Sequence, residues 1–339
     1  ADIEFQHIWS KWQRQEIIWG GGYRFIYSTN DPSTQYGLTP HSRNDSLYSM
    51  FLQDKITIVP DKVFLTIGSK FEHNDYSGFE IQPSVRASWL IGRNHTLWGA
   101  VSRAVHTPSR FDSDGKLSYA IIPPSGAIPL PTLVESTGNK NAESEDLLAY
   151  ELGYRIQPTK DISVDITGFY NNYDKLLTDT FGTATVLGSY IYQPITVMNS
   201  TKAHAFGFEA SSKYDVTKQW RLYAAYSYID LQFNDKSRVI SSFVGKNPKN
   251  MFNLRSNYIF SNDMEMTNSL YTVSKLHDIN ISGYYRFDTK LSYPIAHNID
   301  VALVGQNLFD RRHKESSPFL YQSQEAVGRS VYAGLSFKF

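Results

Sequence analysis

A strict two-residue alternation of apolar and polar side chains is the feature that most constrains this chain. Ile162, Val164 and Ile166 are apolar, and the residues between them are polar. The same pattern recurs in segments around Val85, Tyr150, Leu222 and Tyr285. Successive side chains of a β-strand point to opposite faces, so this period predicts many strands that present one apolar face. No segment of comparable length shows helical spacing as clearly, which makes the expected fold all-β.

The links between these strands alternate in length, and the alternation predicts how the strands are arranged. Short links are expected at residues 10–15, 59–62, 92–96, 157–161, 215–219, 261–265 and 294–298. Long links are expected at residues 28–46, 72–82, 107–146, 173–203, 230–249, 275–282 and 310–330. Transmembrane barrels have tight periplasmic turns and longer extracellular loops, whereas Greek-key sandwiches have no reason to alternate in this way. We therefore expect an antiparallel up-and-down transmembrane β-barrel wall of about fifteen strands.

The bilayer explains why such a sheet has to close on itself. In hydrocarbon every backbone N–H and C=O must be paired within the protein. The apolar set then faces lipid, and the polar set faces the lumen, including Arg155, Asp165, Arg286 and Lys290. Aromatic residues make up 14% of a chain that is only 41% hydrophobic, which suits surfaces between lipid and water. No run of about 18 apolar residues predicts a transmembrane helix.

The end of the chain carries a further signal. Val331, Leu335, Phe337 and Phe339 alternate with polar or small residues, and the chain stops on an aromatic side chain. This pattern resembles the signal that the outer-membrane assembly machinery reads. The final strand follows a long link and the first strand precedes a short one, so both should run toward the periplasm. Bacterial single-chain barrels have even strand counts, so either the count is wrong by one or the chain is part of a larger barrel.

Five stretches occur in the order and spacing of a known family. They are FLQDKITI at 51–58, the stretch 82–110 that ends in SRAVHTPSR, YELGYR at 150–155, GQNLFDRRHKE at 305–315 and GRSVYAGLSFKF at 328–339. The chain resembles the barrel of TonB-dependent outer-membrane receptors over nearly its whole length. That resemblance implies a 22-stranded barrel with an N-terminal plug. Residues 1–339 are then expected to be the C-terminal portion of the barrel, with the plug, the coupling box and about seven strands absent from this chain.

The resemblance also implies a function and its partners. Such a receptor takes up a scarce, bulky nutrient of the ferric siderophore, haem or cobalamin class across the bacterial outer membrane. The expected partners are that small-molecule ligand, the TonB complex through the missing N-terminal part, outer-membrane lipid and lipopolysaccharide. No resident cofactor and no enzymatic activity are expected. The formal net charge of +0 argues against nucleic acid as a partner.

The long link 107–146 and the strand before it hold the predicted ligand-binding residues. These are Arg103, His106, Arg110 and Tyr119. In haem receptors of the resembled family a histidine near this region can ligate iron, although His106 fits an interfacial side chain equally well. The acidic residues 143–146 could hold a divalent cation or could simply be solvated. The basic run 311–314 could attract anionic siderophores or lipopolysaccharide phosphates, or form a plain basic rim.

Two other classes of protein fit parts of the pattern. A passive diffusion porin of sixteen strands needs about this length, and link 107–146 would then fold into the pore with Glu143 and Asp146 as acids. An outer-membrane barrel enzyme would need a catalytic set at one rim, for which His106 and His313 are available. The chain contains neither G-x-S-x-G nor H-E-x-x-H, so no catalytic residue is assigned.

Overall fold

One curved antiparallel sheet dominates the computed structural model, which describes residues 1–234, 247–276, 281–315 and 326–337. Of the 21 strands in these ranges, 19 belong to one sheet, and 15 of these form a continuous meander that we call the wall. The count confirms the expected fifteen. The wall strands are β1 (Asp2–Trp12), β2 (Gln15–Thr29), β4 (Ser42–Val59), β5 (Val63–Asn74), β6 (Gly78–Ile91), β7 (His95–His106), β10 (Glu145–Thr159), β11 (Ile162–Phe181), β13 (Tyr190–Asp215), β14 (Trp220–Phe233), β15 (Asn250–Ile259), β16 (Glu265–Val273), β17 (Tyr284–Ala296), β18 (Ile299–Gln306) and β21 (Ser330–Phe337).

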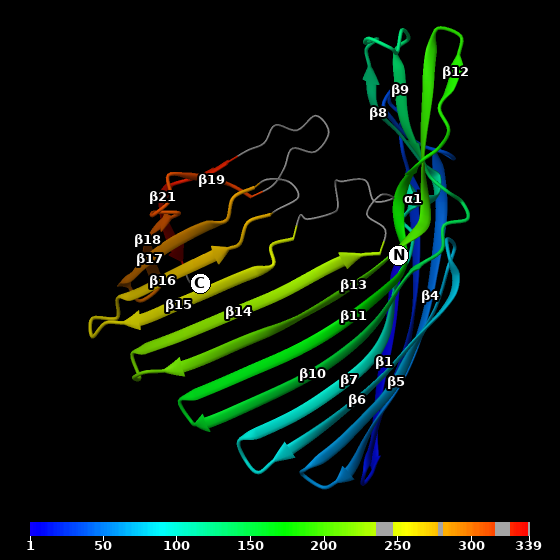
Figure 1. Ribbon diagram of the computed structural model, residues 1–339. Coiled ribbons are helices and arrows are strands. Elements are labelled where there is room, and N and C mark those ends of the chain that lie inside the picture. Colours follow the sequence, from blue (N-terminus) through cyan, green and yellow to red (C-terminus); the bar gives the residue numbers. More distant parts are fainter. Residues whose placement is uncertain (235–246, 277–280, 316–325, 338–339) are drawn as a thin grey trace.

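Each wall strand pairs antiparallel with the next wall strand along the chain, so the wall is a simple meander (Figure 1). Its core is small, because the wall is one layer thick. Many apolar side chains stand exposed on one face, among them Met50, Leu52, Ile67, Val85, Leu152, Ile166, Phe208, Leu303 and Leu335. A sheet in water would bury such a band, so the band fits a surface that faces lipid.

The opposite face carries polar side chains, and we call it the lumen face. Arg155 and Asp165 both lie on this face, as the alternation predicted. Arg155 Nε donates to Asp165 Oδ2 at 2.6 Å across β10 and β11. Trp9, Trp19, Trp89 and Trp220, which lie near the short links, are exposed. Trp98 is packed instead: its ring lies over Gly153 and beneath the Arg86 guanidinium, 4.5 Å from the ring centroid. Glycine leaves room there for the indole, which no pattern of alternation reveals.

All seven predicted short links are short in the structure. The residues between the strands are 13–14, 60–62, 92–94, 160–161, 216–219, 260–264 and 297–298. One predicted long link is wrong, because β5 and β6 continue to Asn74 and Gly78 and leave only residues 75–77 between them. The predicted link 173–203 is also too long, since β11 reaches Phe181 and β13 begins at Tyr190. The ends of β5, β11 and β13 carry polar residues on both faces, so the alternation that marks strands in lipid is absent from them. At the start of β6, Phe79 and Ile81 do alternate with polar residues, and the prediction missed them.

The two edges of the wall are β1 and β21. Within the described residues, β1 pairs only with β2, and β21 pairs only with β18. An odd number of meander strands makes β1 and β21 run in the same direction, so they cannot pair antiparallel with each other. Antiparallel closure therefore requires an odd number of additional strands. None of the described helices is long and apolar enough to cross a bilayer.

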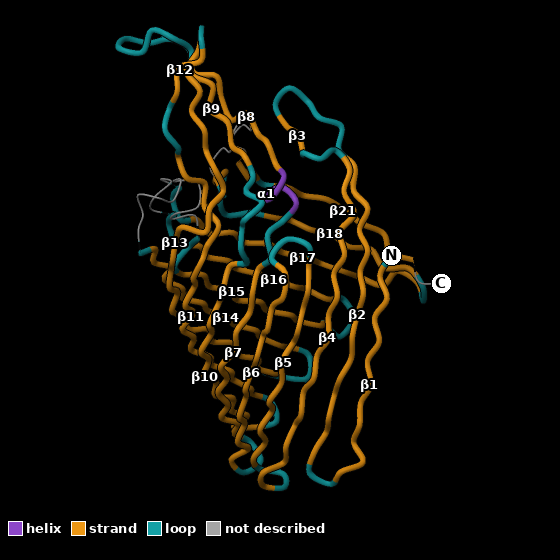
Figure 2. The backbone as a smooth tube through the Cα atoms, turned by 90° about the vertical axis from the view of Figure 1, so that its right-hand side faces the viewer, coloured by secondary structure: helices purple, strands orange, loops and turns teal. Residues whose placement is uncertain are grey.

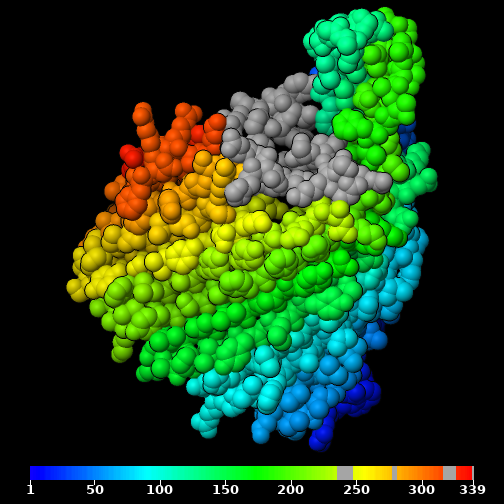
Figure 3. Space-filling model, in the orientation of Figure 1, coloured from blue at the N-terminus to red at the C-terminus, as the bar shows by residue number. Residues whose placement is uncertain are grey.

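Above the end that carries the long links stands a second group of elements, which we call the canopy. It consists of β3 (Tyr36–Leu38), α1 (Arg110–Asp114), β8 (Gly115–Ile122), β9 (Thr132–Thr137), β12 (Thr185–Leu187) and the adjoining ends of β11 and β13. β8 pairs with β3 and with β9, and β9 pairs parallel with β13. Figures 2 and 3 show the canopy projecting well beyond the wall. A separate hairpin of β19 (Arg312–Lys314) and β20 (Ala326–Gly328) lies between β18 and β21 in the chain.

Candidate ligand site

Arg103 lies where the ladder between β6 and β7 ends. The last pair of that ladder is Ser84 with Ser102. The Arg103 guanidinium donates from Nε and Nη2 to Asp146 Oδ2, at 2.9 and 2.6 Å, and from Nη1 to the Ile81 carbonyl. The side chain thus fills a seam in the wall, with its charge opposed by a carboxylate.

His106, the last residue of β7, is the most open of the predicted site residues. Its side chain is 72% exposed, and Nδ1 lies 3.0 Å from Glu145 Oε2. The other oxygen of Glu145, Oε1, accepts the Leu177 backbone N–H at 2.7 Å. The carboxylate therefore orients the imidazole at the canopy base and leaves most of the ring accessible. Ligation of haem by His106 stays a prediction, since no second axial residue is brought to it by the described contacts.

Arg110 anchors the short helix α1. The helix begins after Ser109, whose side chain caps Asp112 while the Asp112 carboxylate accepts the Ser109 N–H. Arg110 donates to the Ser28 hydroxyl at 2.7 Å and to the Pro40 carbonyl at 2.6 Å. Its side chain is only 11% exposed. These contacts tie α1 to the end of β2 and to the link between β2 and β4. The guanidinium therefore holds the fold together rather than facing a ligand.

Tyr119 on β8 completes the predicted set. Its hydroxyl donates to Asp179 Oδ2 at 2.9 Å, and Ser136 donates to the other oxygen of that carboxylate at 3.3 Å. Burial, followed by the bond to Asp179, raises the pKa of Tyr119 well above its ordinary value. Arg110 and Tyr119 thus lie in the canopy, and Arg103 and His106 lie at the end of the wall strand β7. Each of the four is bonded to a partner remote in sequence.

A hub of charged residues, missed by the sequence reasoning, joins the canopy to the wall. Arg43 Nη1 donates to Asp114 Oδ2 at 2.9 Å, and Arg43 Nε lies 2.6 Å from Asp45 Oδ1. Asp45 Oδ2 accepts the Tyr76 hydroxyl at 2.8 Å, and the guanidinium lies 4.3 Å from the centre of the Tyr76 ring. The Asp114 side chain is 1% exposed. Three segments that are remote in sequence meet here, so no local sequence motif could have predicted this hub.

The acidic residues 143–146 do not converge on a shared cation. Glu143 pairs with Lys175, Glu145 with His106, and Asp146 with Arg103. Within the described ranges there is no group of three or more His, Cys, Asp or Glu residues that could hold a metal ion. The basic run 311–314 is not a uniform rim either. His313 is 8% exposed and stacks on Tyr284, with ring centres 4.0 Å apart.

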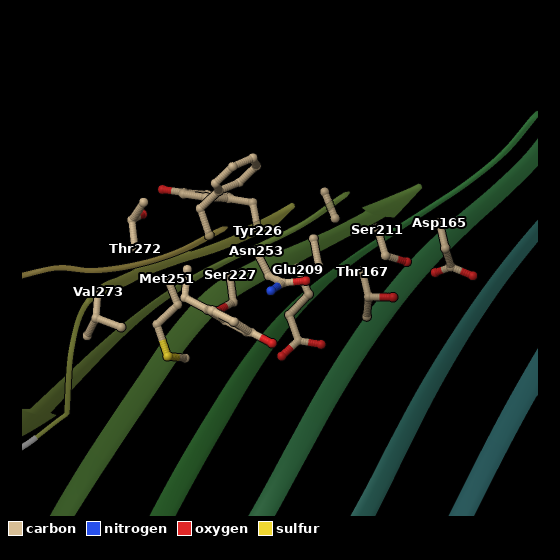
Figure 4. A pocket seen from close by; sticks show the side chains of 14 residues that line it. Asp165, Thr167, Glu209, Ser211, Tyr226, Ser227, Met251, Asn253, Thr272 and Val273 are labelled. Carbon is tan, nitrogen blue, oxygen red and sulfur yellow. The ribbon is translucent and has the colours of Figure 1, made fainter. Parts of the chain in front are cut away.

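Two hollows are candidates for binding. On the lumen face, a hollow of about 430 Å³ is lined by residues that include Asp165, Thr167, Glu209, Met251 and Asn253 (Figure 4). In the canopy, a groove of about 750 Å³ lies between residues 32–41 and strands β8 and β9. We call the second one the canopy groove. Both volumes are typical of small-molecule sites. The sequence carried no periodic signal for the canopy groove, because much of its lining comes from residues 32–41, a link that includes only the three-residue strand β3.

The final strand presents the expected outward set. Val331, Leu335 and Phe337 are 68%, 61% and 55% exposed on one side of β21. Phe339, the fourth residue of the predicted assembly signal, lies outside the described residues. The role of this set in membrane assembly stays a prediction.

The fold defines a class of outer-membrane protein, and the chain can be placed in a family. The family described as "TonB dependent receptor-like, beta-barrel" matches residues 1–308. The chain belongs to this family of transport receptors, and its location is the bacterial outer membrane. The long-link end is therefore extracellular, and the short turns are periplasmic.

Individual relatives agree with the family. The chain is 22% identical over 329 residues to a probable TonB-dependent siderophore receptor, PirA, of Acinetobacter baumannii, covering 86% of this chain and 42% of that protein. It is 21% identical over 285 residues to an iron-regulated outer membrane virulence protein of Vibrio cholerae, covering 79% and 41%. The chain thus spans less than half the length of these curated relatives.

Solved structures show the same fold. The siderophore receptor PirA from Acinetobacter baumannii superposes with a TM-score of 0.77 at 17% identity, covering all of this chain and 54% of that one. The ferric enterobactin receptor PfeA from Pseudomonas aeruginosa, in a mutant form, gives a TM-score of 0.76 at 17% identity, covering 100% and 53%. A likeness at this identity establishes the wall architecture of the present chain and leaves its ligand open.

Proposed function

We propose that the protein is an outer-membrane receptor that takes up ferric siderophores and is energised by TonB. The observation that carries the proposal is the family match over residues 1–308. Relatives described as siderophore receptors support the ligand class, and one solved neighbour is a complex of a receptor mutant with enterobactin. Haem and cobalamin, the other ligands implied by the sequence, have no comparable support here. The same family assignment supports activity as a receptor rather than as an enzyme.

We further propose that residues 1–339 are the C-terminal portion of a 22-stranded barrel. The open edges β1 and β21 support this division, since the wall needs an odd number of additional strands to close. Seven strands would complete the barrel, and a plug domain would fill the lumen and contact TonB. On this division, lipid contacts the exposed apolar band of the wall, and lipopolysaccharide surrounds its extracellular rim.

A transport measurement in the native bacterium tests this function. Deleting the gene should abolish uptake of radioactive iron supplied as a siderophore complex, and restoring it should return the uptake. Dissipating the proton gradient should stop uptake while leaving binding at the cell surface intact. Uptake that persists without the gradient, together with ion conductance in planar bilayers, would refute the proposal and favour the porin. The canopy position of residues 115–137 gives no support to that alternative, because these residues stand above the wall.

A further inference from the structure

The canopy groove lacks the free positive charge that an anionic ligand requires. Among its lining residues the charged side chains are Lys116 and Glu135, with His41 as a third titratable group. Lys116 Nζ lies 3.2 Å from Glu135 Oε2. The same carboxylate accepts the Ser118 hydroxyl at 3.4 Å and the Tyr192 hydroxyl at 3.2 Å. The groove therefore presents a neutralised lysine beside a buried carboxylate, and its lining carries no net charge when His41 is neutral.

The rest of the canopy adds little positive electrostatic potential around the groove. Arg43, Arg103 and Arg110 are each opposed by carboxylates within the fold. Lys175 pairs with Glu143, and Lys202 pairs with Asp174 at 2.8 Å. Lys140 is exposed but is not part of the groove lining. Opposed charges of this kind largely cancel at the distance of a bound ligand, so the described canopy does not attract anions strongly.

What the groove does offer suits an uncharged ligand. Tyr36 stacks on Phe111, with ring centres 5.9 Å apart and planes 7° apart, and remains 36% exposed. Ile121 and Leu133 supply apolar surface on the opposite side. The turn formed by residues 33–36, in which Ser33 Oγ accepts the Tyr36 N–H at 2.9 Å, adds polar backbone. An aromatic face, apolar walls and a few fixed polar groups are the usual elements of a site for a neutral small molecule.

We propose that the canopy groove binds a neutral, oxygen-rich ferric chelate of the tris-hydroxamate type and discriminates against anionic tris-catecholate chelates. This inference rests on the proposed siderophore uptake and names the ligand class of that function. Discrimination comes from Glu135, whose side chain is 8% exposed and whose negative charge faces the groove. An anionic chelate would lose its hydration next to this carboxylate without gaining a cation, whereas a neutral chelate loses far less.

Direct binding to the purified full-length receptor tests the proposal. Two probes are used, a neutral ferric tris-hydroxamate and a triply anionic ferric tris-catecholate, and binding is followed by quenching of tryptophan fluorescence at several salt concentrations. The wild-type receptor should bind the neutral chelate at least about ten-fold more tightly, with an affinity that changes little with salt. Tyr36→Ala should weaken binding of the neutral chelate by about five-fold, because one stacking face is lost.

A charge-release variant makes the test specific to the groove. Glu135→Gln keeps the shape of the side chain and an oxygen that can accept from Tyr192, but it leaves Lys116 unopposed. It should tighten binding of the anionic chelate by about ten-fold and leave the neutral chelate within about three-fold of wild type. Glu143→Gln is the matched control. It frees Lys175 in the same canopy but outside the groove lining, so neither affinity should change.

The outcomes separate this inference from the function on which it rests. Tighter binding of the anionic chelate by the wild-type receptor, weakened by salt, would overturn the ligand class while leaving siderophore uptake intact. Equal effects of Glu135→Gln and Glu143→Gln would overturn the assignment of the groove. Failure of the folded receptor to bind either chelate would overturn the proposed uptake function together with the inference.

Discussion

Removal of the Arg43 guanidinium should detach the canopy from the wall while leaving the wall intact. In Arg43→Met an unbranched apolar side chain replaces the arginine stem, and Asp114 loses its 2.9 Å partner. Asp114 is 1% exposed and would then keep the Ser113 hydroxyl, 3.3 Å from Oδ1, and Arg110 Nε, 3.9 Å from Oδ2. Removing one partner of a buried ion pair costs about 3–5 kcal/mol, because the remaining charge stays desolvated. The canopy should therefore open about 100-fold more often, or more, at equilibrium.

Hydrogen exchange in detergent measures this opening residue by residue. Amides in the β8–β9 ladder, such as Leu117 and Val134, should exchange about 100-fold faster in Arg43→Met, while Ile166 in the wall should keep its rate. Adding Asp114→Asn should restore part of the protection, because it removes the stranded charge.

A matched substitution elsewhere isolates the effect of burial. Arg155→Met breaks an Arg–Asp pair whose arginine side chain is 67% exposed, so it should cost no more than about 1 kcal/mol. A change below three-fold in the β8–β9 amides of Arg43→Met would refute the reasoning. So would an equal loss of protection in canopy and wall, because the hub would then not be a local joint.

Three further predictions concern other parts of the structure. Gly153→Val should destabilise the wall by about 1–3 kcal/mol in urea unfolding, because the new side chain overlaps the Trp98 indole, whereas Gly334→Val, with open space at its Cβ, should not. Asn307→Ala should increase proteolytic cleavage between β18 and β21, since Asn307 is 0% exposed, has φ 53° and donates to the Val327 carbonyl. Because the pKa of Tyr119 is raised in the folded state, the folded protein holds the Tyr119 proton more tightly than the unfolded chain does. The contribution of Tyr119 to stability is therefore complete below about pH 10 and is lost as pH rises through the pKa of the folded state. Tyrosinate absorbance should show a late-titrating group that is missing in Tyr119→Phe.

The wall could be predicted from sequence because a membrane imposes its contrast across every strand. Lipid lies on one face and a polar lumen on the other, so apolar and polar residues such as Ile166 and Asp165 alternate along much of the wall. The alternation weakens where the strands leave the bilayer. Polar residues occur on both faces at the ends of β5, β11 and β13, and the sequence prediction replaced these ends, together with the start of β6, with long loops.

The site could be predicted only as a region, and the reason lies in the range of its contacts. Arg103 is bonded to a residue 43 positions away, Tyr119 to one 60 positions away and Arg110 to one 82 positions away. A single sequence shows that an arginine occurs near a long link, but it does not show whether a remote carboxylate or carbonyl already engages that arginine. Which side chains remain available to a ligand is therefore decided by tertiary pairing alone.

Whether a charged side chain is already paired within the protein determines what it indicates about the ligand of such a receptor. Positive charge in an extracellular link is usually taken as the mark of an anionic ligand, yet here the same charges hold the canopy together. Lys116 illustrates the point, because a single carboxylate, Glu135, decides whether it serves the fold or a ligand. Substituting that carboxylate changes the charge presented to the groove while keeping the side-chain shape. Ligand class in the canopy is therefore set by the carboxylates at least as much as by the cations.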